Sequence, residues 1–187
     1  KDKKKFSRIE IMTNKKYTNL IIDVDGVMTD GKFYYTNDGK VMKAFGADDH
    51  DALSILKKYI NIIFVTGDKK GFKISKKRIN SHMRFPLYLV STVKRVEWIK
   101  KRFELKKCIY IGDGFFDYLV MQKVGFSLTP NNSGNFTKKN ADHVLKRSGG
   151  DRAVAEACIF ILKKFFKINN FSKLNLKSKK MSGTWSI

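Results

Sequence analysis

The chain has 187 residues, of which 42% are hydrophobic and 13% aromatic, and its 39 lysine and arginine residues outnumber 17 aspartate and glutamate residues to give a formal charge of +22. Length and composition fit one domain with a substantial core, and no stretch reaches the roughly 18 uninterrupted apolar residues of a membrane span. The charge would suit an anionic partner, but the basic residues are spread from end to end without interleaved aromatics, which does not favour nucleic-acid binding as the primary role.

Both ends of the chain are polar and basic. Residues 1–17 are rich in lysine and lack the apolar middle of a signal peptide, so we expect a basic N-terminal segment and a cytoplasmic protein. Residues 18–166 form the predicted domain. Residues 167–187 are a polar, basic C-terminal tail with scattered apolar side chains, which either is disordered or docks on another surface.

Short apolar runs alternate with amphipathic stretches along the domain. The predicted strands are 19–24, 32–36, 61–66, 86–90, 108–113 and 125–129. The predicted helices are 50–59, 69–80, 92–104, 116–124 and 152–166. This alternation predicts βαβ units and a mainly parallel sheet, and the lack of polar residues within the runs predicts strands that are covered on both faces. The expected fold is therefore a three-layer, Rossmann-like α/β sandwich.

One hairpin interrupts the alternation. Asn37, Asp38 and Gly39 stand between two strand-like runs and form a strong turn signal. The hairpin follows the first predicted strand and its acidic loop, so we expect it to lie near the mouth of any site there.

Acidic and hydroxyl side chains follow three of the predicted strands. They are Asp23 and Asp25 after the first strand, Thr66, Gly67 and Asp68 after the third, and Asp113 and Asp117 after the fifth. In parallel sheets the ligand site lies at the carboxyl ends of the strands, so these groups are expected to converge. Carboxylates at close range cannot all stay ionised without a cation, and a hard divalent ion such as Mg²⁺ is the natural one.

Each aspartate also has a purely structural explanation. An isolated Asp68 or Asp117 is more simply a helix N-cap or a turn residue, whereas the whole set at strand ends is not. The two cysteines, Cys108 and Cys158, stand in apolar contexts without the spacing of a zinc site and are predicted to be buried thiols.

Four motifs, taken together, resemble those of the haloacid dehalogenase superfamily of phosphatases. They are DVDGV at 23–27, TGD at 66–68, Lys94 at the head of a predicted helix, and GDGFFD at 112–117. The similarity narrows to the 3-deoxy-D-manno-octulosonate 8-phosphate phosphatase subfamily through DVDGVMTDG, the KAF at 43–45, VMQKVGFSL and SGGDRAVAEAC. It extends from about residue 18 to 166. That subfamily has no large cap domain, which agrees with the short gaps between elements here.

The resemblance implies a role for each matching residue. Asp23 would be the nucleophile that forms an aspartyl-phosphate, and Asp25 would protonate the leaving oxygen and then activate water. The side chains of Asp23 and Asp113, together with the main-chain carbonyl of Asp25, would bind Mg²⁺. Asp117 would complete the outer shell of the metal or hold Lys94 in place.

The phosphate contacts come from two further motifs. Thr66 would donate its hydroxyl, and Gly67 its amide, to the phosphoryl oxygens, while Lys94 would neutralise the charge on the transferring group. Lys94 by itself would be read as one of many surface lysines. Its position after PLYLVST, between the second and the fourth motif, is what singles it out.

Two positions depart from the octulosonate pattern. Those enzymes usually carry arginine where this chain has Asp68, and GDD where it has Gly112, Asp113 and Gly114. Asp68 resembles relatives that act on nine-carbon acids, and it would accept hydrogen bonds from substrate hydroxyls, whereas arginine clasps a carboxylate. Gly114 removes one carboxylate near the metal, but Asp113 remains, so we expect metal binding to survive.

The resemblance also implies an assembly. The family forms a homotetramer in which the hairpin of one subunit shields the site of its neighbour. Phe33, Tyr34 and Tyr35 suit such a contact, although core packing would explain these aromatic residues equally well. The closing GTWSI resembles tails that reach an active site in relatives.

The sequence therefore predicts a Mg²⁺-dependent phosphatase for a phosphorylated 3-deoxy-2-keto sugar acid, of the octulosonate type that serves lipopolysaccharide biosynthesis. Three alternatives stay open. The substrate is a nonulosonate or sialic-acid 9-phosphate, or the domain is a non-catalytic module associated with an acylneuraminate cytidylyltransferase, or the protein associates with nucleic acid through its charge alone. The two aspartates at 23 and 25 argue against a silent domain.

Overall fold

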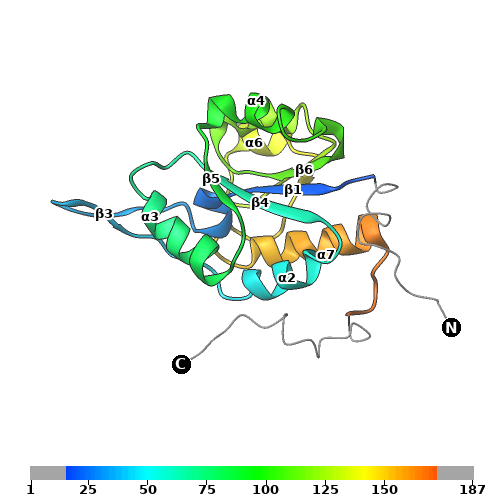
Figure 1. Ribbon diagram of the computed structural model, residues 1–187, viewed down its shortest axis with the longest axis horizontal. Helices are drawn as coiled ribbons and strands as arrows, with labels where there is room; N and C mark the ends of the chain where they lie inside the picture. Colours follow the sequence, from blue (N-terminus) through cyan, green and yellow to red (C-terminus); the bar gives the residue numbers. More distant parts are fainter. Residues whose placement is uncertain (1–15, 172–187) are drawn as a thin grey trace.

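A computed structural model describes residues 16–171 of the chain. Residues 1–15 of the predicted N-terminal segment and residues 172–187 of the predicted tail, including GTWSI, lie outside these residues. Within them, six parallel strands form one sheet in the order β5-β4-β1-β6-β7-β8 (Figure 1). The strands are β1 (Asn19–Asp23), β4 (Asn61–Thr66), β5 (Leu87–Leu89), β6 (Cys108–Ile111), β7 (Phe126–Thr129) and β8 (His143–Val144).

Helices cover both faces of this sheet, as the unbroken apolar strands predicted. On one side lie α2 (Asp49–Leu56) and α7 (Ala153–Phe166), and on the other lie α4 (Arg95–Lys100), α5 (Tyr118–Met121) and α6 (Asn135–Asn140) (Figure 1). The short helix α3 (Phe72–Ser75) and the turn that continues it, Lys76–His82, connect β4 to β5. The predicted three-layer α/β fold without a large cap domain is confirmed.

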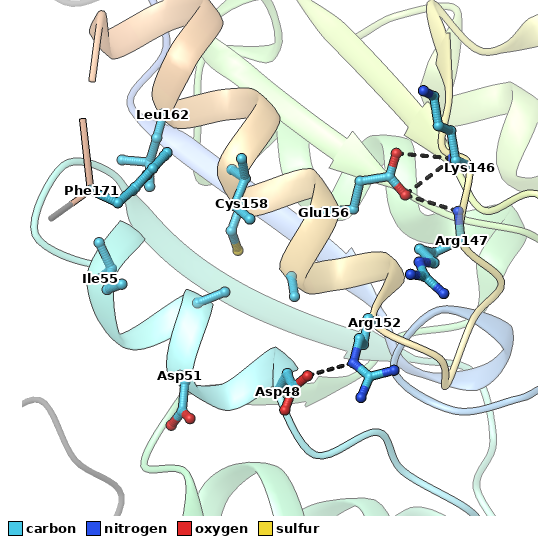
Figure 2. A pocket seen from close by; sticks show the side chains of 13 residues that line it. Asp48, Asp51, Ile55, Lys146, Arg147, Arg152, Glu156, Cys158, Leu162 and Phe171 are labelled. Carbon is cyan, nitrogen blue, oxygen red and sulfur yellow. Dashed lines mark hydrogen bonds and ion pairs between the residues drawn. The ribbon is translucent and has the colours of Figure 1, made fainter. Parts of the chain in front are cut away.

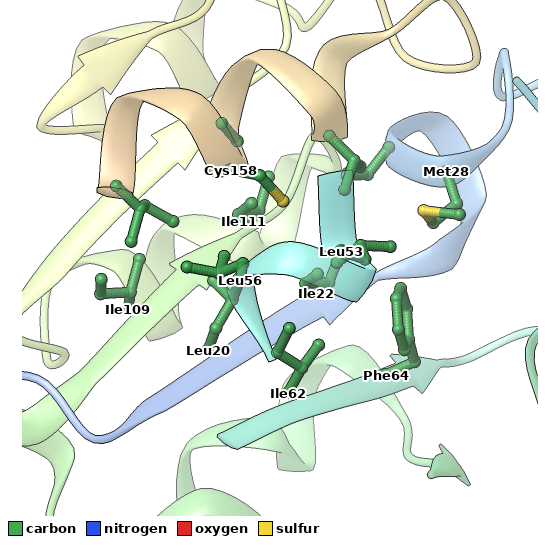
Figure 3. Close-up of a cluster of buried hydrophobic side chains, with 14 of the residues drawn as sticks. Leu20, Ile22, Met28, Leu53, Leu56, Ile62, Phe64, Ile109, Ile111 and Cys158 are labelled. Atoms are coloured by element: carbon green, nitrogen blue, oxygen red, sulfur yellow. The ribbon is translucent and has the colours of Figure 1, made fainter. Parts of the chain in front are cut away.

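Alternate residues of the central strand supply two separate cores. Leu20 and Ile22 face α2 and α7, where they meet Leu53 and Cys158 (Figure 3), whereas Ile21 faces α4 and α5. This is the two-residue period of a strand that is buried on both sides. Both cysteines are buried free thiols, as predicted.

Two elements were missed because the sequence carries little signal for them. Strand β8 has only two residues, and α6 begins in the polar run Asn131–Asn135, which is typical of a loop. Packing on the rest of the fold stabilises both: β8 pairs with β7, and Thr137 of α6 donates its hydroxyl to the carbonyl of Gly114 at 3.2 Å.

The predicted hairpin is present and stands apart from the main sheet. Its strands β2 (Tyr34–Thr36) and β3 (Gly39–Met42) pair with each other in an antiparallel ladder and project away from the body of the molecule (Figure 1). Gly39 has a φ of +115°, a conformation that favours glycine at the turn. Tyr35 is 58% exposed and Phe33 43%, so core packing within one chain does not explain these aromatic side chains.

A buried carboxylate ties α2 to α7. Asp49 is fully buried; its Oδ1 accepts the amide hydrogen of Ala155 at 2.8 Å, and its Oδ2 has no hydrogen-bond partner. Burial raises the pKa of Asp49 to about 6, against the opposing effect of the hydrogen bond from Ala155. The contact therefore caps α7 but disfavours the charged form of the side chain.

Replacing Asp49 by Asn should change how stability depends on pH. The folded protein keeps the Asp49 proton to a higher pH than the unfolded chain, so rising pH between about 4 and 6 favours unfolding of the wild type. We expect the stability of Asp49→Asn relative to wild type to rise across this range by up to about 3 kcal/mol, at roughly 1.4 kcal/mol per pKa unit. Urea denaturation from pH 4 to 7 measures this difference. Asp51→Asn, at an exposed position of the same helix, is the control, and a difference that stays constant with pH would contradict the assignment.

Candidate active site

The loop after β1 is shaped by close main-chain contacts. Asp23 ends the strand, and its Oδ1 accepts the amide hydrogen of Val24 at 2.8 Å. Gly26 has a φ of +81°, and a Cβ at this position would lie 1.9 Å from Oδ2 of Asp113. A side chain at residue 26 would therefore both strain the loop and displace Asp113.

Two further glycines, Gly149 and Gly150, pack closely against the same loop. A Cβ on Gly149 would lie 1.8 Å from the carbonyl oxygen of Gly26, and one on Gly150 would lie 2.5 Å from the amide nitrogen of Asp30. The amide of Gly150 donates to the carbonyl of Val27 at 3.2 Å. The segment that leads into α7 thus packs, main chain on main chain, against the loop after β1.

Three aspartates meet where β1 and β6 end side by side. Asp23, Asp113 and Asp117 each place a carboxylate oxygen so that all three lie within 4.8 Å of one another. Burial, with the neighbouring carboxylates, raises the pKa of Asp23 to about 7 and that of Asp113 to about 8. The predicted convergence of strand-end carboxylates is therefore found for these three residues.

The donor set fits a divalent metal ion. All the candidate ligand atoms are carboxylate oxygens, which hard cations such as Mg²⁺ prefer. In residues 16–171 no basic side chain forms an ion pair with Asp113. The carboxylates that line or adjoin the site are Asp23, Asp25, Asp68, Asp113 and Asp117, and the basic groups paired with them are Lys40, Lys43 and Arg95. With all five carboxylates ionised, two negative charges would be left over, which one divalent cation would balance.

Arg95, and not the neighbouring Lys94, lines the pocket. Lys94 is exposed, whereas the side chain of Arg95 is buried and directed into the site. Arg95 binds Asp23 with both nitrogens of its fork, Nη1 to Oδ2 at 2.7 Å and Nη2 to Oδ1 at 3.0 Å, and Nη1 also donates to Asp117 Oδ1 at 2.9 Å. The reason is local: residues 92–94 form a 3₁₀ turn, and Arg95 shares the buried face of α4 with Ile99, four residues on. That helical period was a signal in the sequence that pointed to Arg95.

Asp117 is fully engaged within the protein. Its Oδ1 accepts hydrogen bonds from Arg95 and, at 2.6 Å, from the hydroxyl of Tyr110, and its Oδ2 accepts the amide hydrogen of Gly114 at 2.9 Å. Sequence reasoning missed Tyr110, which reads as an ordinary core residue of β6. Asp117 thus holds Arg95, the buried basic residue of the site.

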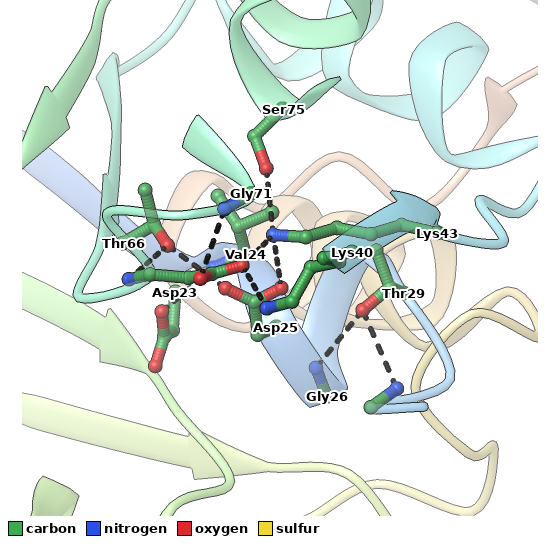
Figure 4. Close-up of polar contacts among 12 residues, drawn as sticks. Asp23, Val24, Asp25, Gly26, Thr29, Lys40, Lys43, Thr66, Gly71 and Ser75 are labelled. Carbon is green, nitrogen blue, oxygen red and sulfur yellow. Dashed lines mark hydrogen bonds and ion pairs between the residues drawn. The ribbon is translucent and has the colours of Figure 1, made fainter. Parts of the chain in front are cut away.

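Asp25 lies apart from the three clustered aspartates. Its Oδ2 accepts the hydroxyl hydrogen of Thr66 at 2.8 Å, and its Oδ1 lies 2.6 Å from the ammonium nitrogen of Lys43 (Figure 4). Thr66 is completely buried and also accepts the amide hydrogen of Asp68 at 3.1 Å. Its hydroxyl is thus directed at Asp25, and Gly67, not Thr66, lines the pocket.

Lys40 and Lys43 of the hairpin reach the site, and sequence reasoning assigned neither of them to it. Oδ2 of Asp68 lies 2.5 Å from the ammonium of Lys40 and 2.8 Å from that of Lys43. Burial opposes ionisation of Asp68, but the hydrogen bonds from Lys40, Lys43 and the Gly71 amide outweigh it and lower its pKa to about 2. Asp68 is therefore an anion over the whole working range of pH.

These groups surround a pocket of about 410 Å³. It is lined by Asp23, Asp25, Gly31, Phe33, Gly67, Asp68, Ser91, Thr92, Arg95, Asp113 and Gly114. A second pocket of about 540 Å³ lies between α2 and α7 (Figure 2) and is lined largely by apolar side chains, with the Arg152–Asp48 ion pair at its edge. None of the strand-end residues lines this second pocket, so the chemistry belongs to the first.

Among residues 16–171, no helix is both long and apolar enough to cross a membrane.

Comparison with known proteins finds curated relatives of one kind. No family model matches the chain. The 3-deoxy-D-manno-octulosonate 8-phosphate phosphatases KdsC of Escherichia coli and Yersinia pestis are 32% identical to it over 148 residues, which is 76% of this chain and 78% of those proteins.

Solved structures agree in fold and size. The deoxy-D-mannose-octulosonate 8-phosphate phosphatase of Haemophilus influenzae, in a cobalt-bound form, is 27% identical with a TM-score of 0.70, over 79% of this chain and 88% of that chain. The 3-deoxy-D-manno-octulosonate 8-phosphate phosphatase of Moraxella catarrhalis, in complex with magnesium, phosphate and KDO, is 29% identical with a TM-score of 0.68, over 82% of this chain and 91% of that chain.

If the aspartate cluster binds a divalent ion, Mg²⁺ should stabilise the fold. At a free Mg²⁺ concentration ten times the dissociation constant, we expect the free energy of unfolding to rise by about 1.4 kcal/mol. Asp113→Asn should abolish this rise, whereas Asp38→Asn, at the exposed tip of the hairpin, should keep it. Chemical denaturation with Mg²⁺ and with EDTA measures both, and an equal rise in the Asp113 variant would place the ion elsewhere.

Proposed function

This chain belongs to the haloacid dehalogenase superfamily, in the family of the 3-deoxy-D-manno-octulosonate 8-phosphate phosphatases, and we propose that it hydrolyses the phosphate ester of a 3-deoxy-2-keto sugar acid of that type. It is a phosphatase, and its cofactor is a divalent metal ion. The observation that carries the proposal is the meeting of Asp23, Asp113 and Asp117 at the strand ends, with the guanidinium of Arg95 bound to Asp23 and Asp117.

Asp23 is the proposed nucleophile. Both Asp23 and Arg95 line the pocket, and the fork of Arg95 fixes the orientation of the Asp23 carboxylate. Attack by a carboxylate oxygen on phosphorus forms the aspartyl-phosphate and breaks the bond between phosphorus and the sugar oxygen. Asp25, on the same loop, gives a proton to the departing sugar oxygen.

The second step returns the enzyme to its starting state. Asp25 takes a proton from water, the water oxygen bonds to phosphorus, and the bond from phosphorus to Asp23 breaks to release inorganic phosphate. Arg95 and the amide of Gly67 neutralise and orient the phosphoryl oxygens during both steps, a role that Arg95 takes in place of Lys94. Asp23, Asp113 and the main-chain carbonyl of Asp25 would hold Mg²⁺, which supplies positive charge beside the phosphoryl group.

The eight-carbon acid is the favoured substrate. The curated relatives in the comparison are octulosonate 8-phosphate phosphatases. The nine-carbon alternative was drawn from Asp68 as an acceptor for substrate hydroxyls, but Oδ2 of Asp68 already binds two ammonium groups and Oδ1 accepts the amide hydrogen of Gly71. The alternative of a non-catalytic domain has no support in these relatives, which are phosphatases.

We also propose that the protein acts as a homotetramer in the cytoplasm. The exposed aromatic side chains of the hairpin, Phe33, Tyr34 and Tyr35, support an assembly in which the hairpin of one subunit covers the site of the next. The scattered basic residues need no nucleic-acid partner, because the substrate itself is an anion that a positive field attracts.

The substrate proposal is tested with a panel of sugar-acid phosphates. Phosphate release from 3-deoxy-D-manno-octulosonate 8-phosphate should exceed that from a nine-carbon 9-phosphate in kcat/KM, and EDTA should abolish both. Asp23→Asn should lower the rate at least a thousandfold, because an amide cannot form the acyl phosphate. Equal release by wild type and Asp23→Asn would rule out the mechanism, and faster release from the nine-carbon ester would reverse the substrate assignment.

The neighbours Lys94 and Arg95 provide a matched pair of variants. Arg95→Gln should lower kcat/KM at least a hundredfold, about 3 kcal/mol of transition-state stabilisation, whereas Lys94→Gln should stay within threefold of wild type. Steady-state kinetics measure both, with the unfolding midpoint of each variant as the check on folding. A large loss in Lys94→Gln alone would restore the original assignment to Lys94.

A further inference from the structure

Most side chains of the hairpin are exposed, but those of Lys40 in β3 and Lys43 directly after β3 are buried. The side chain of Lys43 has no exposed surface and that of Lys40 is 4% exposed, while Tyr35 and Met42 of the same hairpin are more than half exposed. A buried ammonium group is costly unless it is paired, so both lysines must be held by compensating charges.

Lys43 brings three separate elements together. Its ammonium nitrogen lies 2.6 Å from Asp25 Oδ1 in the loop after β1, 2.8 Å from Asp68 Oδ2 after β4, and 3.0 Å from Ser75 Oγ in α3 (Figure 4). The contacts with Asp25 and Asp68 are ion pairs, and the contact with Ser75 is a hydrogen bond. Of these partners, Asp25 is the proposed acid and base of the reaction.

Lys40 connects the same network to the wall of the pocket. Its ammonium nitrogen contacts Asp68 Oδ2 at 2.5 Å and lies 3.3 Å from the ring centre of Phe33, a cation–π contact. Phe33 lines the pocket, whereas neither lysine does. The two lysines therefore act from behind the residues that face the substrate.

The backbone leaves room for this network at Gly71. A Cβ there would lie 2.2 Å from Asp68 Oδ2 and 2.7 Å from Cε of Lys43. The amide of Gly71 donates to Asp68 Oδ1 at 3.0 Å. Asp68 is thus held from the main chain on one oxygen and binds both lysines with the other.

We propose that Lys40, Lys43 and Asp68 form an ionic clasp that anchors the hairpin to the strand ends and positions the side chain of Asp25. This inference rests on the proposed function. It makes Lys43 and Asp68 positioning residues of the phosphatase reaction, and it makes Asp68 the anion that pairs with hairpin cations and not a group that binds substrate hydroxyls. Through Phe33, this segment then lines the site of its own subunit, in addition to covering the site of the next.

Kinetics separate the two roles of Asp68. If Asp68 is a positioning residue, the Asp68→Asn variant should have a kcat for the sugar-acid phosphate that is at least fivefold lower than wild type. Its KM should stay within twofold of wild type. A substrate-binding Asp68 would instead raise KM with kcat unchanged, and that result would overturn the clasp. Mg²⁺ should still stabilise the variant, because Asp23, Asp113 and Asp117 are untouched.

A double-mutant cycle tests the connection between the two residues. Lys43→Met should lower kcat at least tenfold, and adding Asp68→Asn should cause little further loss, because Asp68 acts through the lysine. Lys69→Met, at an exposed lysine beside Asp68, should leave kcat unchanged. The double variant with Asp68→Asn should then have the same kcat as Asp68→Asn alone. The proposal would be refuted if the loss of kcat in the Lys43–Asp68 double variant equalled the product of the two single losses. An unchanged kcat in Lys43→Met would also refute it.

Hydrogen exchange gives a readout that does not depend on activity. Amides of residues 39–45 should exchange at least tenfold faster in Lys43→Met and in Asp68→Asn than in Lys69→Met. If Lys43→Met does not fold, Asp68→Asn and Lys40→Met are compared in its place, with the same expected increase. Unchanged exchange overturns the clasp, whereas a wild type that releases no phosphate from any sugar-acid ester overturns the proposed function and leaves this measurement valid.

Discussion

Carboxylates crowded at the edge of a buried sheet set the main constraint on this protein. Asp23, Asp113 and Asp117 place carboxylate oxygens within 4.8 Å of one another; Asp23 and Asp117 are buried, and Asp113 is partly buried. Mutual repulsion at this distance has to be offset within the fold, because solvent cannot screen it. Arg95, the first residue of α4, offsets part of this repulsion because its guanidinium binds two of the three carboxylates.

A second set of basic groups balances the charge of Asp25 and Asp68. There the balancing charges come from the hairpin and are carried by lysine, whose flexible stem spans from one element to the next. The two basic groups differ in kind as well as in place: Arg95 is planar and engages Asp23 with a fork, whereas Lys43 is a point charge among three oxygens. The acidic residues after β1 are thus stabilised from two directions by two unrelated segments.

The sequence was sufficient for the sheet and for the residues at its edge. Apolar runs without alternation marked the buried strands, and the parallel connection placed Asp23 and Asp113 at neighbouring strand ends. It was not sufficient where tertiary contacts decide the outcome. Strand β8 and helix α6 have little intrinsic preference, and a one-residue shift in the start of α4 decides between Lys94 and Arg95. The partners of Lys43 come from residues 25, 68 and 75, which no local pattern connects.

The glycines that brace the loop after β1 have a mechanical consequence. Gly149 and Gly150 touch Gly26 and Asp30 through main-chain atoms alone, so no rotatable side chain stands between the two segments to absorb a displacement. Closely packed backbone is nearly incompressible, and Ala153 begins α7 only three residues later. A displacement of α7 would therefore act directly on the backbone of the loop that begins at Asp23, which couples the rigidity of the helix to the shape of that loop.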